Sequence, residues 1–284
     1  MLKIAVPNKG ALAEAAVEML TEAGYHQRRS SRDLVTRDVD NDVEFFYLRP
    51  RDIATYVGEG TLDVGITGRD LLHDSGAEAE ESRALGFGRS NFHFAVPVGT
   101  MTDISEFDGR RVATSYATIV RAYLSERGIN AHVVRLDGAV ESAIRLGVAD
   151  AIADVVETGS TLRQAGLEVI GESILQSEAV LIRPRDKMGP DPSDGYDVFD
   201  RRVEGVLVAR AYVMMDYDIR VEQVERAVAL TPGIESPTVS PLHREGWVAV
   251  RSMVRRDAAQ KVMDELWQLG ARGTLVTDIL ACRL

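Results

Sequence analysis

The stretch Ala-Asp-Ala-Ile-Ala-Asp-Val-Val-Glu-Thr-Gly-Ser-Thr-Leu, residues 149–162, carries the clearest fold signal in this 284-residue sequence. Its apolar first half predicts a buried strand, and the stretch leads into a helical pattern. A strand, a glycine-containing turn and a helix in this order are typical of phosphate binding, because the free amides of a helix N-terminus attract anions. The hydroxyls of Thr158, Ser160 and Thr161 add donors, and Gly159 permits a tight turn. An ordinary helix cap explains the same residues equally well.

Around this stretch, the first two thirds of the chain alternate between strand and helix patterns. Strands are predicted at residues 2–6, 43–48, 62–67, 92–97, 111–114, 132–136 and 149–155. Helical spacing is present at residues 11–23, directly after 68–70, and at 119–127 and 139–146. This alternation favours an α/β fold with largely parallel sheets covered on both faces. The proline- and glycine-rich segment 184–195 predicts a surface loop, and a short helix is expected at 196–210.

The last 74 residues follow a different pattern. Strands are predicted at residues 211–217, 236–241, 247–254 and 274–280, with helices at 221–230 and 257–269. The resulting order β-α-β-β-α-β is that of a ferredoxin-like unit. We therefore expect a domain boundary near Arg210.

Composition and charge exclude several classes of protein. The chain is 45% hydrophobic and 27% charged, which is ordinary for a globular protein, and its net charge of -11 argues against a nucleic-acid partner. The single cysteine, Cys282, excludes an internal disulfide framework. The sequence shows no secretory signal pattern and no apolar run long enough to cross a membrane, so a cytoplasmic location is expected.

Several catalytic motifs are absent from the sequence, and this excludes further classes of reaction. The sequence has neither a Walker A motif nor a G-x-G-x-x-G pattern, which weakens kinase-type and dinucleotide hypotheses. It has no G-x-S-x-G elbow, and its five histidines show no metal-ligand spacing. Chemistry by binding, orientation and charge stabilisation is therefore favoured over a covalent intermediate.

Charged residues follow several predicted strands at the point where each strand ends. Lys9, Arg49 and Arg69 occupy equivalent positions after three of them, where loops of an open α/β sheet converge on one edge. Asp154 ends the strand before the phosphate-type turn, and Glu141 lies at the start of an upstream helical pattern. Each residue alone is also explained as surface charge or as a helix-terminus carboxylate. Together, the two carboxylates have the donor chemistry that Mg²⁺ prefers.

Five collinear motifs give the sequence a family resemblance. They are Val6-Pro7-Asn8-Lys9-Gly10, Leu48-Arg49-Pro50-Arg51-Asp52-Ile53, Asp63-Val64-Gly65-Ile66-Thr67-Gly68-Arg69-Asp70, Leu136-Asp137-Gly138-Ala139-Val140-Glu141 and residues 151–162. In this order they resemble ATP phosphoribosyltransferase, the enzyme that opens histidine biosynthesis. The additional C-terminal unit resembles the long, self-regulated form of that family.

The resemblance implies a fold and a reaction. The implied fold is a two-lobed catalytic region like that of a periplasmic binding protein, followed by a ferredoxin-like regulatory domain. Lobe I would comprise residues 1–90 and 184–210, lobe II residues 91–183, and the regulatory domain residues 211–284. The implied reaction joins N1 of ATP to the phosphoribosyl group of phosphoribosyl pyrophosphate and releases pyrophosphate. The implied partners are Mg²⁺, L-histidine as feedback inhibitor, and further copies of the chain in a homo-oligomer.

The resemblance also implies roles for particular residues. Lys9 and Arg49 would face the pyrophosphate, and Glu141 and Asp154 would address the ribose hydroxyls or Mg²⁺. The acceptor nucleotide would lie along Asp70, Leu71 and Tyr116. The 5-phosphate would be held by Glu157, Thr158, Gly159, Ser160, Thr161 and Leu162. Histidine would contact Asp218, Ser236, Thr238 and Gly273, although turn and cap chemistry explains these four residues as well.

Two other hypotheses fit part of the sequence. A cytoplasmic solute-binding or sensing protein would share the two-lobed shape without turnover. A base-salvage phosphoribosyltransferase would share the phosphate loop but normally carries two adjacent acids before it, whereas here Val155 follows Asp154. Such an enzyme also has no need of a C-terminal regulatory unit. Dependence on ATP as the acceptor, rather than on a free base, distinguishes ATP phosphoribosyltransferase from the base-salvage enzyme.

Overall fold

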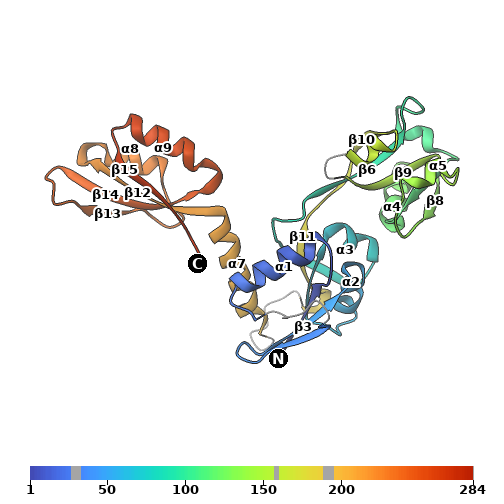
Figure 1. Ribbon diagram of the computed structural model, residues 1–284, viewed down its shortest axis with the longest axis horizontal. Helices are drawn as coiled ribbons and strands as arrows, with labels where there is room; N and C mark the ends of the chain where they lie inside the picture. Colours follow the sequence, from blue (N-terminus) through green and yellow to red (C-terminus); the bar gives the residue numbers. More distant parts are fainter. Residues whose placement is uncertain (27–32, 157–159, 188–194, 284) are drawn as a thin grey trace. The chain divides into compact units, whose positions relative to one another are not determined.

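The computed structural model describes residues 1–26, 33–156, 160–187 and 195–283, which form three β-sheets (Figure 1). Two sheets lie within one compact unit, made of residues Met1–Glu18 and His26–Tyr196. The third lies in a second unit, made of residues Met19–Tyr25 and Asp197–Leu284. The architecture is α/β, as the sequence predicted.

The first sheet has six strands in the order β2-β3-β1-β4-β11-β5. Its central strands, β3, β1 and β4, are parallel, and β1 is buried along almost its whole length because it has neighbours on both sides. Pro50 starts helix α2, and Gly76 ends helix α3 in the left-handed conformation. The elements of this lobe are β1 (Leu2–Pro7), α1 (Ala11–Glu22), β2 (Val35–Asp38), β3 (Val43–Leu48), α2 (Pro50–Gly58), β4 (Val64–Gly68), α3 (Arg69–Ser75), β5 (Ala79–Ala84) and β11 (Ala179–Pro184).

The second sheet has five strands in the order β10-β6-β9-β7-β8. Its core contains the buried rings of Phe92, Phe94 and Phe107, with Phe94 and Phe107 in edge contact at 5.1 Å between centroids. The elements of this lobe are β6 (Ser90–Pro97), a 3-10 turn (Ile104–Phe107), β7 (Arg111–Thr114), α4 (Ala117–Glu126), β8 (His132–Arg135), α5 (Ser142–Arg145), β9 (Ala151–Val156), α6 (Ser160–Gln164) and β10 (Leu167–Ser177).

The chain passes between the two sheets twice, from β5 to β6 and from β10 to β11. The first passage agrees with the predicted lobe boundary near residue 90. The second passage comes earlier than the predicted residue 184, because β11 pairs with β4 and β5 of the first sheet. Residues 179–183 therefore belong to lobe I rather than lobe II.

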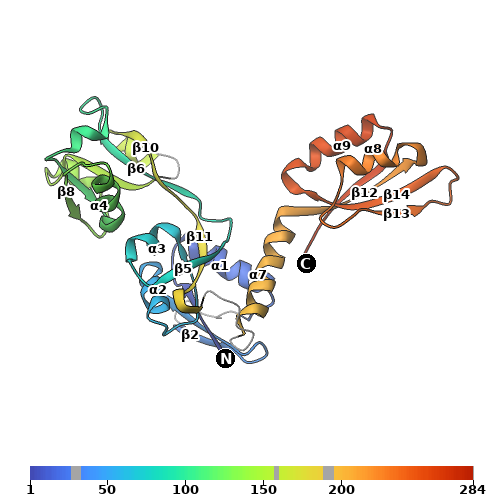
Figure 2. The same ribbon diagram turned by 180° about the vertical axis from the view of Figure 1, so that it is seen from behind.

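Helix α7 (Tyr196–Ala211) leads to the third sheet, whose order is β13-β14-β12-β15. Strand β12 alternates buried and half-buried residues, and its buried side packs against α8 and α9, which cover the same face of the sheet (Figure 2). This antiparallel sheet with two helices is the expected ferredoxin-like unit. Its elements are β12 (Tyr212–Arg220), a 3-10 turn (Val221–Gln223), α8 (Val224–Leu230), β13 (Thr238–Pro241), β14 (Trp247–Arg255), α9 (Ala259–Gln268) and β15 (Arg272–Asp278).

The structure differs from the sequence predictions in three further respects. Strands β2, β5, β10 and β11 were not predicted. They pair antiparallel with their neighbours, as the predicted strands β6 and β9 do with each other, so the sheets are mixed instead of largely parallel. Helix α5 is a single turn, shorter than the predicted 139–146. Helix α7 matches the prediction at 196–210, but from Asp197 onward its residues group with the C-terminal sheet and with Met19–Tyr25, where Phe199 packs on Tyr25.

Candidate active site

The first part of the site is the edge of the first sheet where β1, β3 and β4 end. Pro7 pairs with Leu48, so Lys9 and Arg49 follow neighbouring parallel strands, and the Asn8 amide donates to the Leu48 carbonyl at 2.8 Å. Lys9 is exposed and Arg49 is at least partly so. Their placement at one edge agrees with the expectation from the sequence and leaves both able to meet an anionic ligand.

Arg69 does not join these two cations. Its guanidinium pairs with Glu81 at 2.7 Å and with Glu178 at 3.4 Å, and it also donates to the Gln176 carbonyl at 3.3 Å. The hydrogen bond with Glu81 raises the pKa of Arg69. Arg69 therefore ties helix α3 to the passage between β10 and β11, and its interpretation as a ligand-facing cation is not supported.

Asp70 is buried at the first turn of α3, within a closed hydrogen-bond pair with Ser177. The Asp70 amide donates to the Ser177 hydroxyl at 3.1 Å, and that hydroxyl donates to Oδ1 of Asp70 at 2.8 Å. A Cβ on Gly68 would collide with Oδ1 of Asp70, so glycine at this position makes room for the carboxylate. Leu71 follows and is half-buried.

Tyr116 approaches Asp70 from the N-terminus of α4 in the other lobe. The Asp70 carboxylate acts on its hydroxyl electrostatically. Its ring packs edge-on against Phe92 with 5.1 Å between centroids. Burial, and then the negative charge of Asp70, raise the pKa of Tyr116, so the hydroxyl stays protonated and can donate a hydrogen bond.

Asp154, at the end of β9, completes this group together with Glu141. Burial raises the pKa of Asp154; the Val155 amide opposes this with a 2.8 Å hydrogen bond, and the charges of Glu141 and Asp70 raise it further. Three carboxylates thus act on one another in a half-buried site. Such a concentration of negative charge favours a cation or a positively charged reacting group.

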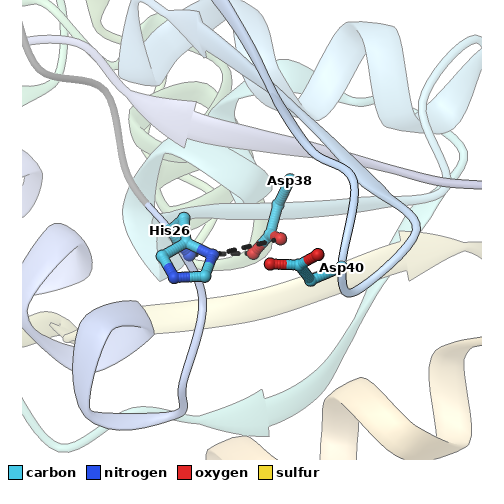
Figure 3. A group of neighbouring side chains, drawn as sticks. All are labelled: His26, Asp38 and Asp40. Atoms are coloured by element: carbon cyan, nitrogen blue, oxygen red, sulfur yellow. Dashed lines mark hydrogen bonds and ion pairs between the residues drawn. The ribbon is translucent and has the colours of Figure 1, made fainter.

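A divalent cation fits the donor chemistry of Asp154 and Glu141, because Mg²⁺ prefers one or two carboxylates plus substrate oxygens. Among the described residues, the three-residue group whose metal-ligating atoms lie within 4.8 Å of one another is elsewhere, at His26, Asp38 and Asp40. There the buried Asp38 carboxylate accepts from the His26 amide at 2.8 Å and from Nδ2 of Asn41 at 2.7 Å (Figure 3). Asp38 therefore closes the turn between β2 and β3.

The predicted phosphate-binding residues are described only in part. Glu157, Thr158 and Gly159 lie outside the described residues. Ser160 and Thr161 are exposed at the start of α6. Leu162 is buried in an apolar cluster with Ile152 and Leu167, so its side chain serves packing.

The four predicted histidine contacts fall into two pairs on the third sheet. Asp218 on β12 and Gly273 on β15 are neighbours, because a Cβ on Gly273 would lie 3.5 Å from Oδ2 of Asp218. Thr238 begins β13, which pairs with the far side of β14, and Ser236 lies just before it. Strand β14 separates the two pairs, and the sheet alone does not bring all four residues together.

Three residues of the site region were not predicted: Arg51, Asp74 and Ser177. Ser177 contacts Asp70 from 107 positions away, so no local pattern indicates it. Asp74 follows Asp70 by four residues, which places both on one face of α3 and is a signal that the sequence did offer. Its carboxylate pairs with Arg51 at 3.0 Å, so this pair lies directly beside the predicted site residues.

The fold and these contacts define a two-lobed α/β enzyme-like region with a charged site and an appended ferredoxin-like domain. A family model described as ATP phosphoribosyltransferase matches residues 49–204, and one described as HisG, C-terminal domain matches residues 209–281. The chain therefore belongs to the ATP phosphoribosyltransferase family.

Relatives of full length agree with this assignment. ATP phosphoribosyltransferases from Arthrobacter sp. (strain FB24) and Micrococcus luteus are 64% and 66% identical over 286 residues, covering 100% of both chains in each case. A solved structure described as an ATP phosphoribosyl transferase (HisG:HisZ) complex from Thermotoga maritima matches with a TM-score of 0.64 and 26% identity. That match covers 73% of this chain and 98% of the other.

Family membership decides among the hypotheses from the sequence. The protein is an enzyme, a phosphoribosyl-transferring glycosyltransferase with ATP and phosphoribosyl pyrophosphate as substrates, and it serves the first step of histidine biosynthesis. This excludes a solute-binding protein without turnover and a base-salvage enzyme. Among the described residues, no helix is both long and apolar enough to span a membrane.

Proposed function

We propose that this chain joins N1 of ATP to C1 of phosphoribosyl pyrophosphate and releases pyrophosphate, with the residues of the site in the roles that follow. One observation supports the proposal most: the carboxylates of Asp70, Asp154 and Glu141 and the hydroxyl of Tyr116 act on one another electrostatically, although they come from both lobes. A site that concentrates negative charge suits a reaction in which positive charge develops on a ribose ring.

The chemistry requires little acid–base catalysis. Adenine N1 is neutral and carries a free lone pair, so it needs no base before it attacks. As the bond from C1 to the pyrophosphate oxygen breaks, negative charge grows on the leaving group and positive charge on the ribose. Lys9 and Arg49 would stabilise the leaving group, and Asp154 and Glu141 the ribose. Asp70, Leu71 and Tyr116 would hold the acceptor nucleotide.

Two further groups would bind the donor. Residues 157–162 would hold the 5-phosphate through backbone amides and hydroxyls. Asp154 and Glu141 would address the ribose hydroxyls or hold Mg²⁺, which when bound would neutralise charge on the pyrophosphate. Removing Mg²⁺ with a chelator should abolish turnover, and adding Mg²⁺ in excess should restore it.

Regulation is the second half of the proposal. L-Histidine would bind at the C-terminal domain and inhibit the enzyme. Thr238 lies on β13, on one side of β14, whereas Asp218 and Gly273 lie on β12 and β15, on its other side. Strand β12, which carries Asp218, is two strand spacings, about 10 Å, from β13. A homo-oligomer would therefore complete the histidine site, with one pair of residues from each of two copies. A cytoplasmic location stays a prediction from the sequence.

The proposal is tested by measuring pyrophosphate release from phosphoribosyl pyrophosphate with and without ATP, and then with L-histidine. Release that requires ATP and declines with histidine supports both parts. ATP-dependent release that histidine does not change would remove the regulatory part and keep the catalytic one. Folded, Mg²⁺-supplied protein that releases no pyrophosphate would contradict the catalytic proposal.

A further inference from the structure

Helix α4 of lobe II is capped by a residue of lobe I. Its own N-cap residue, Tyr116, makes no side-chain capping bond. Instead Oδ1 of Asp74, on α3, accepts from the Thr118 amide at 2.8 Å and from the Ile119 amide at 3.4 Å. These are amides of the first helical turn, which have no partner inside the helix and carry the positive end of its dipole. The buried Asp74 carboxylate is thus a helix cap supplied from the opposite lobe.

The second oxygen of the same carboxylate is held by Arg51. Nη1 of Arg51 donates to Oδ2 of Asp74 at 3.0 Å, and the Asp74 side chain is only 6% exposed. The guanidinium carbon of Arg51 also lies 5.1 Å from the centre of the Tyr116 ring. One carboxylate and one guanidinium therefore fix both the backbone after Tyr116 and the ring of Tyr116 itself.

Helix α3 presents two carboxylates to the start of α4. Asp70 and Asp74 are four residues apart, on the same helical face. The Asp70 charge acts on the Tyr116 hydroxyl, whereas Asp74 accepts hydrogen bonds from two amides of the first turn of α4. Contacts thereby locate Tyr116 at two points, its ring and the helix that it begins.

We propose that Asp74 and Arg51 are positioning residues, which hold Tyr116 against Asp70 across the two lobes and so shape the part of the site that receives the acceptor nucleotide. This inference rests on the proposed role of Asp70 and Tyr116 beside the nucleotide. The side-chain contacts of Asp74 and Arg51 given above reach α4 and Tyr116, on the nucleotide side of the site. Loss of the pair should therefore impair use of ATP much more than binding of phosphoribosyl pyrophosphate.

The first test compares Asp74→Ala, Asp74→Asn and Arg51→Met with the wild-type enzyme by steady-state kinetics. Asp74→Ala removes a buried charge-assisted contact to both partners, and we expect the KM for ATP to rise about tenfold or more, with kcat reduced. The KM for phosphoribosyl pyrophosphate should stay within about twofold. Asp74→Asn keeps an oxygen for the α4 amides and should restore part of the loss.

Asp150→Asn is the matched control. It breaks an ion pair with Arg111 of similar length, 2.9 Å, in the same lobe as α4 but away from Tyr116. Its kinetic constants should equal those of the wild type. If thermal unfolding shows that Asp74→Ala does not fold, the test uses Asp74→Asn and Arg51→Met instead. Asp74→Asn keeps an oxygen for the α4 amides, and Arg51→Met keeps the Asp74 carboxylate on those amides.

The second test asks whether Asp74 acts through Tyr116. Tyr116→Phe should raise the KM for ATP in the wild-type background but add little in the Asp74→Ala background, because the ring is then already misplaced. Additive effects, or equal changes in both KM values, would overturn the proposal and leave Asp74 a purely structural cap. A wild-type enzyme without ATP-dependent pyrophosphate release would instead contradict the proposed function, so the two failures are distinguishable.

Discussion

The catalytic region and the C-terminal domain present their candidate residues in different ways. In the catalytic region, Asp70 is buried and Tyr116 and Asp154 are half-buried, and the charge of Asp70 raises the pKa of both Tyr116 and Asp154. In the C-terminal domain, Asp218 and Thr238 lie on a sheet with β14 between them. The first group comes from one chain, whereas the proposed histidine site would need a ligand or a second copy to connect its two halves. Substitutions should therefore act on turnover in the first region and on regulation in the second.

The largest expected effect is at Asp154. Asp154→Asn removes a negative charge that the proposed function assigns to the developing positive charge on the ribose, and kcat should fall about a thousandfold. Asp150→Asn, four residues earlier and outside the site, is the control and should keep wild-type turnover. Single-turnover measurements of pyrophosphate release are the direct readout. A decrease in kcat of tenfold or less would show that the coupled carboxylates are not the catalytic group. The contrast between the catalytic region and the C-terminal domain would then fail.

Lys9→Ala should have the second largest effect. Lys9 is exposed next to Arg49, so its loss should leave folding unchanged but lower kcat about a hundredfold through poorer stabilisation of pyrophosphate. The KM for ATP should change little, because the nucleotide is assigned to the Asp70 and Tyr116 side of the site. Lys9→Arg, which keeps the charge, should recover part of the rate. Normal turnover of Lys9→Ala would make Lys9 an ordinary surface charge.

The sequence predicted most of the fold because its apolar patterns are local. Central strands such as β1 and β12 show clear runs or alternation of apolar residues and were predicted almost to their ends. The edge strand β5 has the charged sequence Ala-Glu-Glu-Ser-Arg-Ala and carries no such pattern. Strand β10 is interrupted by a register shift between Ile170 and Leu175, which hides its length. These missing strands explain part of the wrong expectation of largely parallel sheets; the rest is the antiparallel pairing of the predicted strands β6 and β9.

The candidate site was predictable where a motif marks it and unpredictable where two distant segments meet. Asp154 was singled out at the end of a predicted strand and Asp70 from the family resemblance, and the charge of Asp70 helps to raise the pKa of Asp154. Asp74 caps α4 across 44 positions, and no local pattern encodes that pairing. The pairing of Arg69 with Glu81, 12 positions away, and with Glu178, 109 positions away, was likewise not indicated by a local pattern. For a charged residue at a strand end, the sequence alone does not show whether it binds a ligand or pairs with a distant residue of the chain. The three-dimensional contacts decide between the two.

Asp218→Ala tests whether the C-terminal domain acts on regulation and not on turnover. Removal of this carboxylate should raise the histidine concentration for half-inhibition about tenfold, as expected for loss of one charged hydrogen bond. Turnover without histidine should stay near the wild-type value, because Asp218 belongs to the separate C-terminal unit. Thr238→Ala, on the other side of β14, should weaken inhibition in the same direction. An unchanged inhibition curve for both variants would remove the proposed histidine site from this sheet.

The smallest expected effect concerns stability and pH at a position outside both sites. The hydrogen bonds from Arg111 lower the pKa of Asp150 from 3.8 to about 2. A carboxyl group with a lowered pKa in the folded state stabilises that state above its unfolded pKa and loses this contribution as the pH falls through the folded value. Asp150→Asn should thus reduce the free energy of unfolding by about 0.5 kcal/mol at pH 7, a small value because the pair is partly exposed to solvent. The difference from the wild type should shrink between pH 5 and pH 2, as measured by urea unfolding at each pH. A difference that stays constant across this range would mean that the substituted amide costs packing or hydrogen bonds and that the ion pair itself contributes nothing.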